Sequence, residues 1–258
     1  MAMAVTGDNE LLELFTRYNE DLWPLHLVGY AVGVAAVALL FARRRDRADR
    51  LIAGLLAALW LWQGVVFQGL YATDVDVVLG TAYAMMFVLE AYLLFRHGVL
   101  RGELAFRSRA GLTGAVGWAA LGYAVIIYPV IGAVLGHGWP ESPLLGMAPC
   151  PTTILTFGLL LLAAPPLPRR LLIVPFAWAV LAPPAAMARG VYEDAGLLIA
   201  GLVTVVLVLV RDRRRRRGGP APADAPSTET PQFHDDESRV GHEYLHPRSS
   251  VEQHAAQP

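Results

Sequence analysis

Seven apolar segments constrain this chain more than any other feature of its sequence. They occupy residues 22–42, 51–71, 77–95, 110–135, 144–164, 171–188 and 195–210. About 20 helical residues cross a bilayer core of roughly 30 Å, and the segments approach that length. Inside a bilayer every backbone polar group must be bonded within the protein, which restricts spanning chains to helices and closed barrels. These segments therefore predict an all-α fold, a polytopic membrane helical bundle with about seven transmembrane helices.

Arginines lie in alternate connections between these segments. Residues 43–50 hold five arginines, residues 96–109 four, residues 169–170 two and residues 211–217 six, which together make 17 of the 21 basic residues. Because cytoplasmic connections are enriched in arginine, this pattern predicts an amino terminus outside and a carboxyl terminus in the cytoplasm. The fifth segment must also cross, since otherwise residues 211–217 would lie outside. We expect a multi-pass protein of the bacterial inner membrane.

The composition divides the chain into three regions. Residues 1–21 form an amphipathic outer-surface segment, because "NELLELFTRYNED" gathers its apolar side chains largely on one helical face. Residues 22–210 form the seven-span membrane domain. Residues 211–258 form a basic anchor and a disordered cytoplasmic tail rich in Pro, Ala, Gly and acids. The run Arg213–Arg217 directly follows a span, so the expected partner is the lipid bilayer and not nucleic acid.

Four short stretches are together distinctive: "YNEDLWP", "LWLWQG", "YP" at Tyr128–Pro129, and "GMAPCPTTILTFGLLL". With them the chain resembles an uncharacterised family of bacterial multi-pass membrane proteins, a domain of unknown function with a G-x-A-P-C-P-T-T motif. The resemblance covers most of residues 10–210 and not the tail. It implies a membrane location and a helical fold, and it implies no mechanism.

The Pro-Cys-Pro corner is the first candidate site. Its prolines favour the start of a helix, which would direct free N–H groups and partial positive charge toward the outer membrane face. The candidate residues here are Cys150, Thr152, Thr153 and Thr156. One interpretation is a polar-solute site at a broken helix, as in many transporters. The other is structural, with threonines bonding back to carbonyls and the cysteine as a small filler.

Polar residues inside other spans complete the candidate solute site. Glu90 is the one acid well inside a predicted span, and intramembrane acids commonly mark solute or proton pathways. Tyr83 lies seven residues before it on the same helical stripe. Pairing of Glu90 with an arginine of residues 43–50 would instead make it structural. Gln63 in the second span is suited either to a polar cavity or to hydrogen bonding between helices.

Residue types exclude several chemistries. The chain has no lysine, which excludes Schiff-base catalysis, and its single cysteine excludes an internal disulfide. We predict no catalytic residue, metal site or cofactor, so an enzyme is the less favoured class. The preferred interpretation is a small-solute permease or solute-binding membrane protein. The alternatives are a non-catalytic membrane scaffold or partner protein, and a thiol-dependent membrane redox protein centred on Cys150. The identity of the solute and the oligomeric state stay open.

Overall fold

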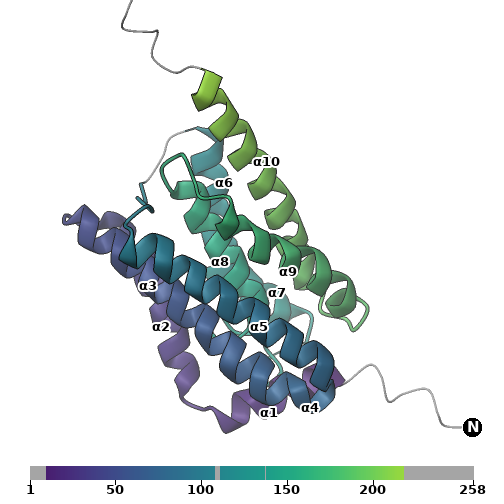
Figure 1. Ribbon diagram of the computed structural model, residues 1–258. Helices are drawn as coiled ribbons and strands as arrows, with labels where there is room; N and C mark the ends of the chain where they lie inside the picture. The colour runs from purple at the N-terminus through teal and green to yellow at the C-terminus, as the bar shows by residue number, and fades with distance from the viewer. Residues whose placement is uncertain (1–9, 108–110, 137, 218–258) are drawn as a thin grey trace, which may run out of the picture. The chain divides into compact units, whose positions relative to one another are not determined.

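The computed structural model describes residues 10–107, 111–136 and 138–217. About 80% of it is helical, and no strand occurs in these ranges, which confirms the all-α prediction. The elements are α1 (Glu10–Asp21), α2 (Leu25–Ala38), η1 (Leu39–Phe41), α3 (Arg45–Trp62), η2 (Gln63–Ala72), α4 (Thr73–Val75), α5 (Val77–Leu94), η3 (Phe95–Leu100), α6 (Leu112–Gly122), η4 (Tyr123–Ile127), α7 (Tyr128–Val134), α8 (Pro149–Leu162), α9 (Arg170–Met187), η5 (Tyr192–Asp194) and α10 (Ala195–Arg217) (Figure 1). The predicted tail after residue 217 lies outside the described residues.

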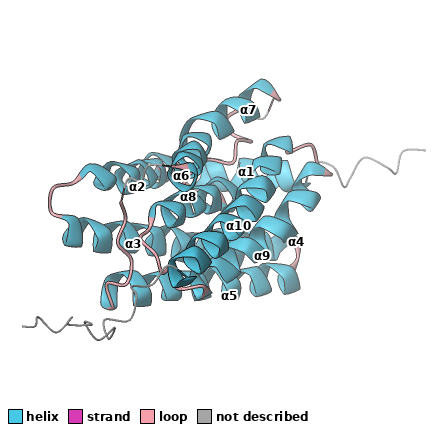
Figure 2. Ribbon diagram, turned by 90° about the horizontal axis from the view of Figure 1, so that it is seen from above, coloured by secondary structure: helices cyan, strands magenta, loops and turns pink. Residues whose placement is uncertain are grey.

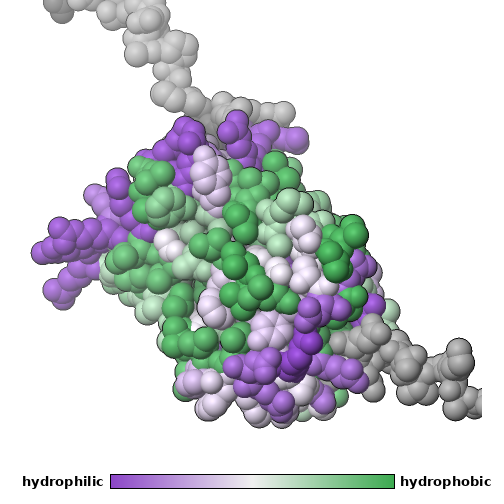
Figure 3. Space-filling model, turned by 60° about the horizontal axis from the view of Figure 1, so that its bottom comes forward, coloured by the Kyte–Doolittle hydropathy of each residue, from purple (hydrophilic) through white to green (hydrophobic). Residues whose placement is uncertain are grey.

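Five helices in these ranges are long and apolar enough to cross a membrane. They run over Arg45–Val75, Val77–Leu100, Leu112–Val134, Arg170–Met187 and Tyr192–Arg213. The pair α1 and α2–η1 makes a sixth if it is counted as one span, although it bends by 96°. One face of the molecule has apolar residues between hydrophilic residues at its two ends, as lipid contact requires (Figure 3). Length and composition therefore establish five or six candidates, and the predicted count of seven is not confirmed.

The helix that falls short is α8, which has 14 residues. It is about 21 Å long at 1.5 Å per residue, less than a bilayer core. All of its residues are buried, and the other helices surround it (Figure 2). It approaches α6 closely at two glycines, because a Cβ on Gly158 would meet the Gly117 carbonyl oxygen at 3.0 Å. By length α8 is therefore a shorter apolar helix and is not among the five candidates.

Three of the long helices contain π-helical turns. The longest is η2, ten residues that continue α3 from Gln63 to Ala72. Shorter stretches continue α5 as η3 and α6 as η4. Such wide turns are rare, and they occur often beside functional sites. In this chain η2 continues the C-terminal end of α3, and η2 contacts α1.

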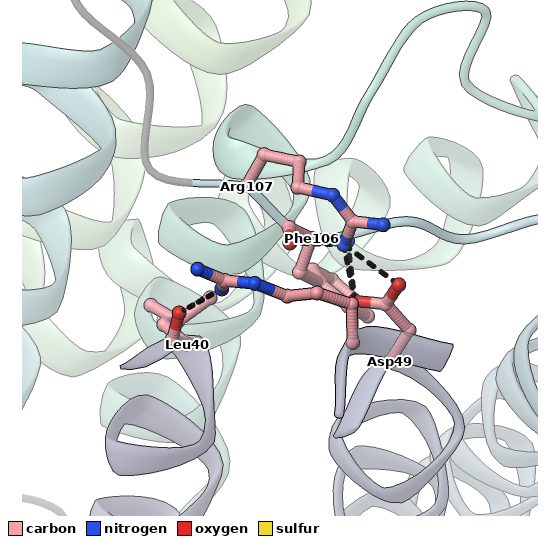
Figure 4. A network of polar contacts seen from close by, with 5 residues as sticks. Leu40, Asp49, Phe106 and Arg107 are labelled. Atoms are coloured by element: carbon pink, nitrogen blue, oxygen red, sulfur yellow. Dashed lines mark hydrogen bonds and ion pairs between the residues drawn. The ribbon is translucent and has the colours of Figure 1, made fainter. Parts of the chain in front are cut away.

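The arginine-rich connections meet at one end of the helices. Asp49, at the start of α3, accepts hydrogen bonds from the Phe106 N–H at 2.9 Å and from the Arg107 guanidinium at 2.7 Å (Figure 4). The Arg107 N–H donates to the Leu162 carbonyl of α8 at 2.9 Å. The Leu167 N–H donates to Asp212 of α10 at 3.2 Å. The four connections that the sequence assigns to one side are thus joined to one another.

Helix α1 packs on the opposite end. Its apolar side chains Leu14, Phe15 and Tyr18 are buried against Phe67 of η2 and Met147. The Tyr18 hydroxyl donates to the Met147 carbonyl at 3.2 Å, and Trp62 Nε1 donates to that hydroxyl at 2.8 Å. Residues 10–21 therefore form a helix. Its apolar face contacts the rest of the protein.

Candidate functional site

A cavity of about 220 Å³ lies beneath α1. Its walls come from α1, η2, α4, the first half of α5, α7, the first turn of α8, α9 and η5. Most of the lining is apolar, including Phe15 from α1, Phe67 from η2 and Leu181 from α9. Elements far apart in the sequence thus enclose one space at the end away from the arginines.

A buried acid lies in the wall of this cavity. Asp194, the last residue of η5, is 2% exposed, and its Oδ1 accepts a hydrogen bond from the Tyr128 hydroxyl. The Cys150 thiol lies beside this carboxylate. Neither the hydroxyl nor the thiol carries a positive charge. No ion pair joins Asp194 to a basic side chain in the part of the chain that the structure describes.

The cavity lining also contains aromatic side chains, one of which carries a buried indole N–H group. The Trp178 ring of α9 contacts the Tyr83 ring of α5 edge to face, with the centroids 5.2 Å apart. Trp178 is 7% exposed, and its indole N–H has no oxygen or nitrogen acceptor among the residues that the structure describes. The Cys150 sulfur is the polar group beside it, and sulfur accepts hydrogen bonds only weakly. The indole N–H is therefore available to an acceptor that enters the cavity.

The Pro-Cys-Pro corner starts α8, as predicted, but it offers few donors. The helix begins at Pro149, with Ala148 extended at φ −93° and ψ 144°. The Ala148 N–H donates to the Leu144 carbonyl at 2.7 Å, and neither Pro149 nor Pro151 has an N–H. Of the donors that a helix start normally leaves free, only the Cys150 N–H is left. An anion bound by free N–H groups of Thr152 and Thr153 is not supported, because these residues lie beyond the first three helical positions.

The threonines bond inside the protein. The hydroxyls of Thr152, Thr153 and Thr156 donate to carbonyls four residues earlier, at 2.8–2.9 Å. Thr152 Oγ1 also accepts from Gln63 Nε2 at 2.7 Å. Thr156 Oγ1 accepts from Trp60 Nε1 at 3.0 Å. These bonds join α3 and η2 to α8 through Gln63, Thr152 and Thr156. They correspond to the structural interpretation of these residues and not to a solute site.

Glu90 lies in α5 apart from the cavity. It is fully buried, and neither carboxylate oxygen has a hydrogen-bond partner among the described residues. The expected alternative of a pair with an arginine of residues 43–50 is not realised. Within that segment Arg45 donates to the Leu40 carbonyl, and Arg50 donates to the Val99 carbonyl.

The structure thus brings two of the predicted residues, Tyr83 and Cys150, to one cavity. Sequence analysis missed Asp194, Tyr128 and Trp178, which line the same space. Asp194 ends "RGVYED", which reads as an outer loop. The available signal was the acid pair "ED" placed directly before an apolar segment. No group of three or more His, Cys, Asp or Glu is arranged to hold a metal ion within the described ranges.

Comparison with known families gives a match to a family of unknown function, DUF6064, over residues 9–218. The match includes every residue that the structure describes, and it ends at residue 218. No curated protein and no solved structure matches the chain.

Proposed function

This chain belongs to DUF6064, a family of unknown function, and from that premise we propose that it is a membrane protein that binds a small solute in the cavity beneath α1. In this proposal the protein crosses the bacterial inner membrane seven times, with its amino terminus outside. The cavity then opens on the outer side, and the protein serves as a small-solute permease or solute-binding protein.

One observation supports seven crossings, and another supports the orientation. The five long helices and α2 supply six, and α8 supplies the seventh because it runs between the cavity end and the arginine end. The joined arginine connections support the orientation, since cytoplasmic connections carry the excess of arginine.

The observation that carries solute binding is a buried acid without a cationic partner in the wall of an apolar cavity. A desolvated carboxylate is costly to keep unless a partner compensates it. Pockets that bind small molecules are mostly apolar, with a few convergent polar groups, and this cavity has that character. A permease also needs a path inward, for which Glu90 is the candidate because it is buried without a partner.

Labelling of Cys150 in intact cells tests the proposal. One sample receives a membrane-impermeant maleimide and another receives permeant N-ethylmaleimide. We expect both reagents to label the thiol, more slowly than an exposed cysteine. Since Cys150 is the one cysteine in the sequence, Cys150→Ser is a complete background control.

Two further single-cysteine variants, made in the Cys150→Ser background, report which side of the membrane each end of the protein faces. Tyr192→Cys, at an exposed position of the cavity end, should react with both reagents. Arg44→Cys, at an exposed position of the arginine end, should react only with the permeant reagent. Labelling of Arg44→Cys by the impermeant reagent would contradict the orientation. A Cys150 that neither reagent reaches would contradict an accessible cavity.

A further inference from the structure

We propose that the solute is a small organic amine, bound through its ammonium group to Asp194. This inference rests on the proposed function and names the ligand class of the same cavity. The argument uses the charges of the lining, the bonds already made by Asp194, the aromatic side chains and the size of the space.

The cavity lining carries an excess of negative charge. Its charged residues are Asp76, Asp194 and Arg189. Asp76 is exposed, and its carboxylate caps α5 by accepting the Val78 and Leu79 N–H groups at 2.9 Å. Arg189 is also exposed, and its guanidinium donates to the Ala185 carbonyl at 2.9 Å. The one buried charge in the lining is therefore the Asp194 carboxylate.

Among the described residues, Asp194 has a hydrogen-bond donor but no ion pair with a basic side chain. The Tyr128 hydroxyl that donates to it and the Cys150 thiol beside it are both neutral. A carboxylate has about four lone-pair sites, so it retains acceptor capacity for a ligand N–H. An ammonium group supplies both the donors and the missing charge, and such charge-assisted bonds are roughly twice as strong as neutral ones.

The aromatic side chains suit the same ligand. Tyr83, Tyr128 and Trp178 line the cavity, and ring faces attract cations that are removed from water. The apolar part of the lining suits a hydrocarbon body. The indole N–H of Trp178 is a donor, which an ammonium group cannot satisfy, so the aromatic contribution to amine binding comes from the ring faces.

The volume limits the size of the amine. A cavity of about 150 Å³ holds one benzene molecule. The space here, about 220 Å³, therefore admits a benzene-sized body with a few additional atoms. Benzylamine meets this limit, and benzyl alcohol is its neutral counterpart of the same shape.

The test is binding of benzylamine, benzyl alcohol and benzoate to the purified full chain in lipid nanodiscs, read by calorimetry and by protection of Cys150 from N-ethylmaleimide. We expect benzylamine to bind at least about tenfold more tightly than benzyl alcohol, as a charge-assisted hydrogen bond gives. Benzoate should bind most weakly. In Asp194→Asn the preference for the amine should fall to about twofold or less.

Asp76→Asn is the matched control. It makes the same chemical change at the exposed rim of the same cavity, and asparagine keeps the helix cap. This variant should retain the amine preference. If Asp194→Asn does not fold, the comparison of the three compounds on the unaltered chain still tests whether the cavity prefers an amine.

Equal binding of amine and alcohol would overturn the amine assignment, and so would binding of none of the three compounds. Amine preference that survives Asp194→Asn would overturn the role of Asp194. These failures differ from failure of the proposed function, in which Cys150 is unreactive to both maleimides in cells.

Discussion

The buried acidic side chains at the two ends of the helical bundle have different partners. At the arginine end, Asp49 pairs with Arg107 at 2.7 Å and Asp212 pairs with Arg211 at 3.0 Å. At the cavity end, Asp194 receives a hydrogen bond from a tyrosine and lies beside a cysteine thiol, and no described basic side chain pairs with it. All three acids are buried. Burial alone therefore does not distinguish them, and the presence or absence of an arginine does.

This difference separates acids that hold the fold from an acid that can hold a ligand. A buried carboxylate next to arginine is compensated within the chain, and it also satisfies backbone donors such as the Phe106 and Leu167 N–H groups. A buried carboxylate with neutral donors is compensated only in part. Its remaining capacity is the physical basis of the proposed solute site.

The largest expected effect is at Asp49. Replacing it in Asp49→Ala leaves the Phe106 N–H and the half-exposed Arg107 without their acceptor. We expect the free energy of unfolding to fall by about 2–3 kcal/mol. The measurement is denaturant or thermal unfolding of the full chain in detergent. Asp46→Ala, at an exposed acid on the same helix, is the control. A loss no greater than that of the control would show that the ion pair does not stabilise this end.

The second effect concerns the packing that places α8 between the two ends. In Gly158→Ala the new Cβ would lie 2.7 Å from Leu121 Cδ2 and 3.0 Å from the Gly117 carbonyl oxygen. We expect a loss of about 1–3 kcal/mol from overpacking. Gly122→Ala in α6 is the matched control, since nothing lies within 4 Å of its added Cβ. That variant should be neutral or slightly stabilising in the same unfolding measurement. Equal stability of the two variants would contradict the close approach of α6 and α8.

Glu90 extends the comparison to an acid in the middle of a helix. Because neither carboxylate oxygen has a described partner, Glu90→Met should raise the free energy of unfolding by about 1 kcal/mol. Unfolding of the variant in detergent gives the value directly. Glu20→Met, at an exposed acid of α1, is the control and should leave stability nearly unchanged. A clear loss of stability in Glu90→Met would mean that the carboxylate is compensated after all.

Asp194 should differ from Asp49 in the same assay. In Asp194→Asn the amide oxygen still accepts the Tyr128 hydroxyl, and no cationic partner is lost. We therefore expect the free energy of unfolding to change by less than about 1 kcal/mol, while the preference for the amine over the alcohol falls to about twofold or less. A loss as large as that in Asp49→Ala would place Asp194 with the structural acids and would remove the contrast between the two ends.

The smallest effect is a dependence on pH at the arginine end. A hydrogen bond with the His97 ring lowers the pKa of Glu103 from its ordinary 4.5, with Arg101 adding a smaller contribution in the same direction. A lowered pKa means that the ionised glutamate stabilises the fold above its ordinary pKa. That contribution is lost as the pH falls through the lowered value.

The expected result is a small stability advantage of the unaltered chain over Glu103→Gln near neutral pH, which disappears in acid. Unfolding curves of both proteins at about pH 7 and about pH 3 measure it. Glu103 is one-third exposed, so screening keeps the difference small. A difference that is the same at both pH values would exclude titration of Glu103 as its source.

Part of this architecture follows from local sequence alone. Apolar length predicts the long helices, and the prolines predict where α8 begins, because both depend on neighbouring residues. The alternation of arginines also predicts which connections belong together, and Asp49, Arg107, Leu167 and Asp212 meet accordingly.

The candidate site depended on contacts that local sequence does not record. Cys150 and Tyr83 were recognisable as polar residues inside apolar segments. Asp194 was not recognisable, because its place in the site depends on residues that are distant in the sequence. These are Tyr128, 66 positions away, and Trp178 on another helix. The sequence also left open whether Gln63 and Thr152 line a polar cavity or hydrogen-bond between helices. In the structure they bond to each other across 89 positions.

The sequence by itself therefore determined that the chain forms apolar helices with arginines on alternate connections, since hydropathy and charge are properties of the residues themselves. Only the tertiary structure decided which buried acid has an arginine partner and which faces a cavity. Pairing is a property of distances between helices, and many arrangements of the same helices satisfy the same hydropathy.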